Sequence, residues 1–154
     1  MIVRRARVKD IPQTAALGVE MLKYHLRFDK YFTPSRNARA GYAKFFKSSI
    51  FSRKRQLLVV EEAGKIVGYS LAMLSSRPAV FKLRKIGMIT DVFIAKPFRR
   101  RGTARRILEE QYSWLRRKGF KVAELAVHSR NELGKRAWTK YGFDCFVEKR
   151  RRWI

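Results

Sequence analysis

The sequence is poor in cysteine, in acidic residues and in long apolar runs. Cys145 is the one cysteine among 154 residues, which excludes an internal disulfide and a cysteine-based zinc site and is typical of a reducing compartment. No stretch reaches the roughly 18 uninterrupted apolar residues that a membrane-spanning helix requires, and the first residues lack the apolar core of a signal peptide. These absences predict a cytoplasmic protein with no membrane partner and no bound metal.

The scarcity of acidic residues leaves a large positive charge. Asp and Glu number 12 against 37 Lys and Arg, so the formal net charge is +25. A small phosphorylated ligand does not require such an excess, which instead favours contact with a polyanion such as nucleic acid or the ribosome. A basic surface that serves solubility alone is the other interpretation.

The apolar residues suffice for one core, so a single domain over residues 1–154 is expected, since 46% of the residues are hydrophobic. Apolar patterns predict strands over residues 2–8, 56–61, 65–74, 89–95, 122–127 and 143–153. Helices are predicted to begin after Asp10 as the capping residue, near Thr33, after Gly102 and at Asn131. This order predicts an α/β (α+β) fold, a mixed sheet with helices on both faces.

Two local features add detail to this outline. Gly68 interrupts a predicted strand and indicates a bulge or a close approach of another backbone. His25 and Asp29 are four residues apart between the first two helices, which is compatible with part of an acceptor site or with a capping or core-edge role.

The segment 89–107 contains a strand, an arginine-rich loop and the start of a helix. Backbone N–H groups in the first turn of a helix lack intrahelical acceptors and suit a phosphate. Gly102 allows close approach of the backbone, Ala104 is small, and the surrounding arginines add charge. The loop therefore predicts a pyrophosphate site. It contains neither the P-loop pattern nor the three glycines of a dinucleotide fold.

The spacing of Arg99, Gly102 and Ala104 resembles the Gln/Arg-x-x-Gly-x-Gly/Ala loop of the GNAT superfamily of N-acetyltransferases. Two further segments resemble the same family in the same order: Ile66-Val-Gly-Tyr69, and Leu125-Ala-Val127 followed by Asn131 and Ala137-Trp-Thr-Lys-Tyr-Gly-Phe143. The resemblance covers the whole chain. It implies a mostly antiparallel GNAT-like sheet and acetyl-CoA as the acetyl donor, with CoA as the product.

The resemblance also implies which residues bind the coenzyme. The backbone of Val92, Phe93 and Ile94 would line the pantetheine arm, and the Ile94 N–H would point at the thioester oxygen. The remaining residues assigned to the coenzyme are Arg99, Arg100, Arg101, Gly102, Thr103, Ala104, Arg105, Asn131 and Trp138.

The catalytic groups depart from the family pattern. Trp138 stands where many members have a tyrosine that protonates the thiolate, and its indole N–H is no useful acid. Tyr141 is the substitute candidate, with simple packing as the alternative. Thr90 and Ala126 occupy positions at which some members carry a glutamate base, so Asp91, acting through water, is the best base candidate, with a buried structural role as its alternative.

The acceptor is predicted from charge alone. A free polyamine would be repelled, whereas a primary amine on a protein, or one associated with nucleic acid, fits the basic surface better. The rival interpretation is a basic nucleic-acid- or ribosome-binding module that keeps the fold without transfer activity. A second copy of the chain, forming a homodimer, is a further candidate partner.

Overall fold

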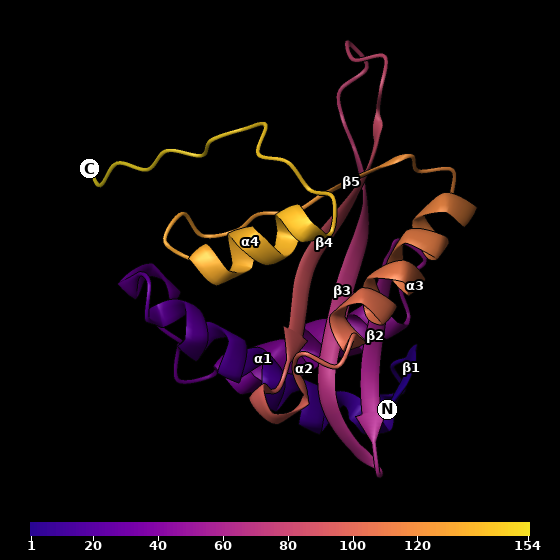
Figure 1. The fold of residues 1–154 in the computed structure, drawn as a ribbon, viewed down its shortest axis with the longest axis vertical. Coiled ribbons are helices and arrows are strands. Elements are labelled where there is room, and N and C mark those ends of the chain that lie inside the picture. Colours follow the sequence, from indigo (N-terminus) through magenta and orange to yellow (C-terminus); the bar gives the residue numbers. More distant parts are fainter.

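The computed structural model describes all 154 residues, which form one five-stranded sheet with helices on both faces (Figure 1). The strands are β1 (Ile2–Arg5), β2 (Arg55–Glu62), β3 (Lys65–Ser76), β4 (Lys85–Ile94) and β5 (Val122–Glu124). The helices are α1 (Ile11–Leu26), α2 (Ala38–Ile50), α3 (Thr103–Arg117) and α4 (Glu132–Lys140), with the 3-10 turns η1 (Val8–Asp10), η2 (Lys30–Phe32) and η3 (Lys96–Phe98). None of the helices has the length and apolar character needed to cross a bilayer.

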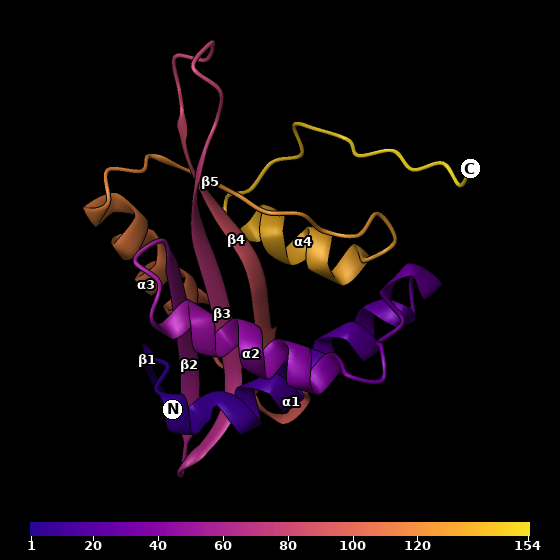
Figure 2. The same ribbon diagram turned by 180° about the vertical axis from the view of Figure 1, so that it is seen from behind.

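The sheet order follows the chain order, β1-β2-β3-β4-β5. The first four strands pair antiparallel, and β5 pairs parallel to β4 over three residues. Helices α1 and α2 lie against one face, as the view from behind shows, and α3 lies against the other (Figure 2). The predicted mixed, mostly antiparallel sheet with helices on both faces is therefore confirmed.

A core on each face of the sheet follows from this layering. On the α1 and α2 side, Phe46 and Tyr69 are fully buried, and on the α3 side Ile107 and Leu108 are. The central strand β3 is buried along most of its length because it is covered on both faces.

Two irregularities shape the central strands. The prediction for Gly68 is confirmed, since a Cβ there would lie 2.8 Å from the Phe93 carbonyl oxygen and the β2–β3 register shifts beside it. A second bulge inserts Thr90 into β4, because Leu71 pairs with Asp91 and the adjacent Ala72 pairs with Ile89. Ile89 faces α3 before this bulge and Val92 faces it afterwards, so Asp91 faces α1 and α2.

The predicted final strand over residues 143–153 is wrong. Residues 144–154 form no strand and no backbone hydrogen bond, and Cys145 is exposed there. The physical reason is the lack of an edge to pair with, since β5 ends at Glu124 instead of residue 127 and offers three residues. Four consecutive cations at 149–152 also repel one another.

Other predicted boundaries shift at turns. The first strand ends at Arg5 instead of residue 8 because residues 8–10 form η1, and the second helix begins at Ala38 instead of Thr33. Helix α1 does begin after Asp10, but the predicted side-chain cap is wrong. The Asp10 carboxylate accepts from the Arg7 N–H at 2.7 Å and from Arg4 instead.

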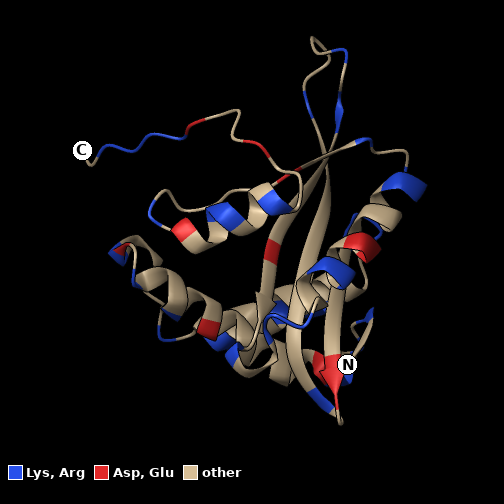
Figure 3. Cartoon of the chain, in the orientation of Figure 1, with Lys and Arg blue, Asp and Glu red and all other residues tan.

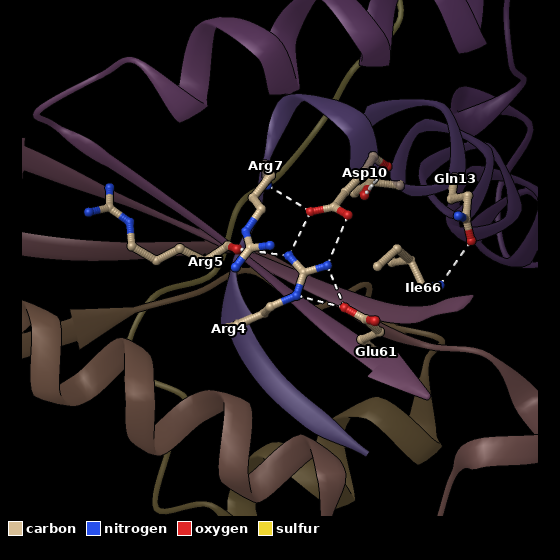
Figure 4. Close-up of polar contacts among 8 residues, drawn as sticks. Arg4, Arg5, Arg7, Asp10, Gln13, Glu61 and Ile66 are labelled. Carbon is tan, nitrogen blue, oxygen red and sulfur yellow. Dashed lines mark hydrogen bonds and ion pairs between the residues drawn. The ribbon is translucent and has the colours of Figure 1, made fainter. Parts of the chain in front are cut away.

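An ion cluster around Arg4 joins β1, α1 and β2 (Figure 4). The Arg4 guanidinium donates to both Asp10 oxygens, at 2.7 and 2.9 Å, and its Nε donates to Glu61 Oε2 at 2.7 Å. Asp10 is buried, and the hydrogen bonds from Arg4 lower the pKa of its carboxyl group. The cluster fixes the beginning of α1 against the edge of the sheet.

Candidate functional site

The loop between β4 and α3 adopts the conformation that its glycine permits. Gly102 has a φ of +74° and is the N-cap of α3, and Arg100 also has a positive φ, of +60°. A β-branched residue would be strained at either angle. The chain thus turns sharply from the end of the sheet into the helix, as the sequence predicted.

This turn presents a run of free backbone donors. The N–H groups of residues 100–105 have no acceptor within the protein, and the next N–H, that of Arg106, bonds to the Gly102 carbonyl oxygen at 3.1 Å. A Cβ placed on Gly102 would meet no atom within 4 Å, so this side of the loop is open. Six N–H groups at the positive end of a helix dipole form an anion-binding surface.

The side chains of the loop divide into two groups. Arg100, Arg101 and Arg105 are exposed and make no ion pair, whereas Thr103 is buried and Ala104 packs against the α3-side core. The exposed arginines therefore add positive charge around the free N–H groups, and the small residues let the helix start close to the sheet.

Arg99 lies apart from this group. Its Nε donates to the Ile94 carbonyl oxygen at 2.6 Å, and its guanidinium lies 5.5 Å from the Phe93 ring centre and 5.8 Å from that of Tyr24. The side chain of Arg99 thus joins the end of β4 to α1 instead of extending along the loop.

The last residues of β4 have one free backbone edge. The Ala95 N–H bonds to the Val67 carbonyl oxygen at 2.9 Å, so by strand alternation the Phe93 N–H also faces β3 and those of Val92 and Ile94 face the opposite way. Pairing with β5 ends at Met88, so no strand covers that side. The N–H groups of the predicted ligand backbone are therefore free at Val92 and Ile94 and turned inward at Phe93, while the Ile94 carbonyl oxygen accepts from Arg99.

Asp91 lies beside this edge on the α1 and α2 face of the sheet. Protein surrounds its partly accessible carboxylate on most sides, and this burial raises the pKa of Asp91 to about 6. The Thr90 hydroxyl lies 3.3 Å from Oδ2, and no cation forms an ion pair with the carboxylate. A carboxyl group that titrates near pH 6 can accept a proton at neutral pH.

Helix α4 carries the remaining predicted residues. Asn131 is buried and caps α4, since its Oδ1 accepts from the Gly134 N–H at 2.9 Å, and the Tyr24 hydroxyl lies 3.5 Å from the same oxygen. Trp138 and Tyr141 are partly buried in an edge-to-face pair at 6.1 Å, within a cluster that includes Val92. Helix α4 thus packs, through Trp138 and Tyr141, against the same core cluster as Val92 of β4.

The structure also shows the roles of Asp29 and Tyr112, of which only the first was expected. Asp29 caps η2 by accepting from the Tyr31 N–H at 2.9 Å, and His25 Nδ1 lies 3.0 Å from the Met21 carbonyl oxygen, so the capping interpretation is confirmed for Asp29. Sequence analysis missed Tyr112, whose buried hydroxyl has no hydrogen-bond partner and whose pKa is raised by burial. Its helical spacing is that of an ordinary core residue, so no sequence signal distinguishes it.

Two depressions lie elsewhere on the molecule. One, of about 410 Å³, lies between β1, β2 and the second half of α3, and another, of about 500 Å³, lies between α3 and β5. Neither is lined by the Gly102 loop or by the free edge of β4. The candidate site is therefore separate from both depressions and is built from a loop and a strand edge.

Comparison with known proteins adds independent information. The sequence model of the "Acetyltransferase (GNAT) family" matches residues 21–143. An "Uncharacterized N-acetyltransferase" of Archaeoglobus fulgidus is 27% identical over 136 residues, which are 88% of each chain. The crystal structure of a tetramutant of the BH1408 protein of Bacillus halodurans has a TM-score of 0.88 and 26% identity, with 100% of both chains covered.

A more distant structure contains the coenzyme itself. A predicted acetyltransferase of Clostridium acetobutylicum, crystallised with acetyl-CoA, has a TM-score of 0.75 and 21% identity, covering 98% of this chain and 94% of that one. At this identity the likeness is one of fold.

Proposed function

Since this chain belongs to the GNAT acetyltransferase family and is an acetyl-CoA-dependent N-acetyltransferase, we propose that it binds the coenzyme on the Gly102 loop and the free edge of β4. We propose further that it acetylates a primary amine on a protein or on a nucleic-acid-associated acceptor. Family membership favours this transferase over the non-catalytic binding module.

The observation that carries the coenzyme site is the run of six free N–H groups at residues 100–105. They would bind the pyrophosphate, with Arg100, Arg101 and Arg105 around them. From there the pantetheine arm would follow Val92 and Ile94, whose backbone groups have no strand partner. The Ile94 N–H would donate to the thioester oxygen and stabilise the negative charge that develops there.

The proton transfers are assigned to two side chains. Asp91, acting through water, would remove a proton from the acceptor ammonium, because its pKa of about 6 leaves it ionised at pH 7 and still basic. The neutral amine then forms the new C–N bond as the C–S bond breaks, and the proton that the nitrogen loses in this step passes through water to replace the one that Tyr141 gives up. Tyr141, in the cluster with Val92, would donate a proton to the departing thiolate.

The charge distribution supports the proposed acceptor class. The loop between β3 and β4 and the C-terminal segment both carry several cations, and Figure 3 shows them extending from the body of the protein. A surface of this kind attracts polyanions and molecules bound to them. An amine presented next to nucleic acid would therefore be concentrated at this protein.

A matched pair of glycine variants tests the coenzyme site. Saturating acetyl-CoA at 100 times its Kd should raise the free energy of unfolding of the wild-type protein by about 2.7 kcal/mol. Gly102→Val should abolish this gain by blocking backbone approach. Gly64→Val is the control, because Gly64 has the same φ within a few degrees, +76°, and equally open surroundings in the β2–β3 turn. Equal gains in both variants would place the coenzyme elsewhere.

The acceptor class requires a separate experiment. The protein is incubated with radiolabelled acetyl-CoA and a host lysate, and label is counted in the protein, RNA and small-molecule fractions, with Gly102→Val as the blank. Label in protein or RNA supports the proposal. Label confined to small molecules contradicts the acceptor class, and no label above the blank contradicts transfer.

A further inference from the structure

Three separate parts of the chain meet around the carboxylate of Asp29. Asp29 follows α1, His128 lies in the segment before α4, and Arg151 belongs to the C-terminal segment. Asp29 Oδ1 accepts from the Tyr31 N–H at 2.9 Å, and Oδ2 accepts from Arg151 Nη2 at 2.7 Å and lies 3.6 Å from His128 Nε2. One carboxylate oxygen is therefore held by the backbone, and the other faces the Arg151 guanidinium and the His128 ring.

Aromatic rings complete the surroundings of the Arg151 guanidinium. It lies 5.2 Å from the ring centres of both Tyr31 and Trp153, which are themselves 6.3 Å apart. The combination of a carboxylate and ring faces is a recognition site for a guanidinium or ammonium group. The two rings are largely open to solvent, since Tyr31 is 63% exposed and Trp153 is 75% exposed.

The two sides of this contact differ in how firmly they are held. The Asp29 N–H bonds to the His25 carbonyl oxygen at 3.2 Å, and Phe28 stacks on His128 at 5.8 Å, so the receiving side belongs to the folded body. Residues 144–154 make no backbone hydrogen bond, and their one ion pair with the body is that of Arg151. The occupant can leave without disturbing the fold.

We propose that Asp29, Tyr31 and His128 form a binding site for an arginine or lysine side chain of a basic protein segment. In the free protein the chain's own Arg151 fills this site, so the C-terminal segment is an internal competitor that the basic segment displaces. An exposed pair of this kind contributes little free energy, which makes the exchange easy.

The location connects the site to acceptor binding. Phe28 contacts Tyr24 edge to face at 5.3 Å, and the Tyr24 hydroxyl lies 3.5 Å from Asn131 Oδ1 at the start of α4. A basic segment bound at Asp29 would therefore lie next to the candidate transfer site. This connection to the acceptor rests on the proposed function, whereas the cation site itself does not.

The test measures binding to the full-length protein. The probe is a fluorescein-labelled peptide with the sequence of residues 148–154, Glu-Lys-Arg-Arg-Arg-Trp-Ile, titrated at low salt with anisotropy as the readout. Arg151→Ala should bind it about fivefold more tightly than wild type, because the internal competitor is removed. Arg150→Ala is the matched control, since it removes the same charge from a residue that pairs with Glu148 alone.

Two further variants test the receiving side. Asp29→Asn, added to Arg151→Ala, should return the affinity to the wild-type value or below, and Asn still caps η2 through its carbonyl oxygen. Tyr31→Leu in the same background should also weaken binding. Equal affinities of Arg151→Ala and Arg150→Ala would overturn the proposal, as would tight binding that survives Asp29→Asn. If the wild-type protein does not bind acetyl-CoA but the peptide binds as expected, the result would count against the transferase proposal and not against the cation site.

Discussion

The two ends of α1 each carry an Arg–Asp pair of the same length, and the pairs behave differently. At the beginning of the helix, Arg4 and Asp10 are 2.7 Å apart, with side-chain exposures of 18% and 5% (Figure 4). Beyond its end, Arg151 and Asp29 are also 2.7 Å apart, but Arg151 is 45% exposed. The 16 residues of α1 separate the pairs by about 24 Å.

The N–O distance of an ion pair therefore does not determine how much the pair contributes to stability. Arg4 donates to two carboxylates at once and ties three elements of the fold, so removing it leaves Asp10 buried and unpaired. Arg151 makes one hydrogen bond to the body from a segment that forms no backbone hydrogen bond. The first pair holds the fold together, and the second holds a segment that can exchange.

The largest expected effect is at the first pair. Arg4→Ala should lower the free energy of unfolding by about 3 kcal/mol, because it leaves a buried carboxylate without its cation. Urea unfolding at pH 7 measures this. Arg5→Ala is the control on the same strand, since Arg5 is exposed and forms no ion pair, and its effect should stay within about 0.5 kcal/mol.

The pH dependence of the same pair provides a check. The pKa of Asp10 is lowered in the folded protein, so the stabilisation is complete above the unfolded value of 3.8 and is lost as the pH falls through the folded pKa. In Arg4→Ala this decrease in stability at low pH should be absent. If the stability of the variant falls with pH as that of the wild type does, the decrease does not come from the Arg4–Asp10 pair.

Asp91 extends the comparison to a partly buried carboxylate that forms no ion pair with an arginine. Asp91→Asn should lower kcat about 100-fold and remove the rise in rate that the wild-type enzyme should show as the pH increases through about 6. A pH–rate profile measures both. Asp144→Asn is the control, because Asp144 is exposed and unpaired.

Replacing Asp91 should raise the free energy of unfolding, whereas replacing Arg4 should lower it. The pKa of Asp91 is raised from 3.8 to about 6, so ionisation costs stability progressively as the pH rises through that window. The Asn variant should therefore be more stable than wild type by up to about 3 kcal/mol at pH 8 and equal to it below pH 3.8. A less stable variant at pH 8 would indicate a structural role.

The smallest effect should be at the second pair. Arg151→Ala should leave the urea midpoint where Arg150→Ala leaves it, because an exposed pair adds little to stability. The Trp153 indole N–H resonance should instead report the change. In wild type it should shift with added NaCl up to 1 M, where the Debye length is about 3 Å, and in Arg151→Ala it should already be at its high-salt position.

The sequence predicted features that depend on neighbouring residues. Gly102 marked the turn into α3 because its left-handed conformation and the helix that follows are local properties. The close approach of another backbone at Gly68 was likewise predicted, since a glycine inside an apolar strand indicates a crowded backbone. The order of strands and helices followed from their patterns.

The features that were predicted wrongly or missed depend on which partner a residue meets in the folded chain. Residues 143–153 have strand-like composition, but whether they pair depends on the edge that β5 leaves. Asp10 is a good helix cap by its position, yet Arg4 and the backbone of Arg7 take up its oxygens. Nothing near Asp29 in the sequence indicates Arg151, which is 122 residues away.

The bulge at Thr90 determines where β4 can change in length, which substitutions would not reveal. Gly87 and Ile89 face α3 before it, and Val92 and Ile94 face α3 after it, so one extra residue changes the alternation from odd to even positions. Deleting Thr90 would therefore restore a regular strand and leave every other side chain of β4 on its present face. Deleting Phe93, beyond the bulge, would instead turn Ile94 to the α1 and α2 face and its N–H toward β3. The strand should therefore tolerate a shorter length at the bulge and not beyond it.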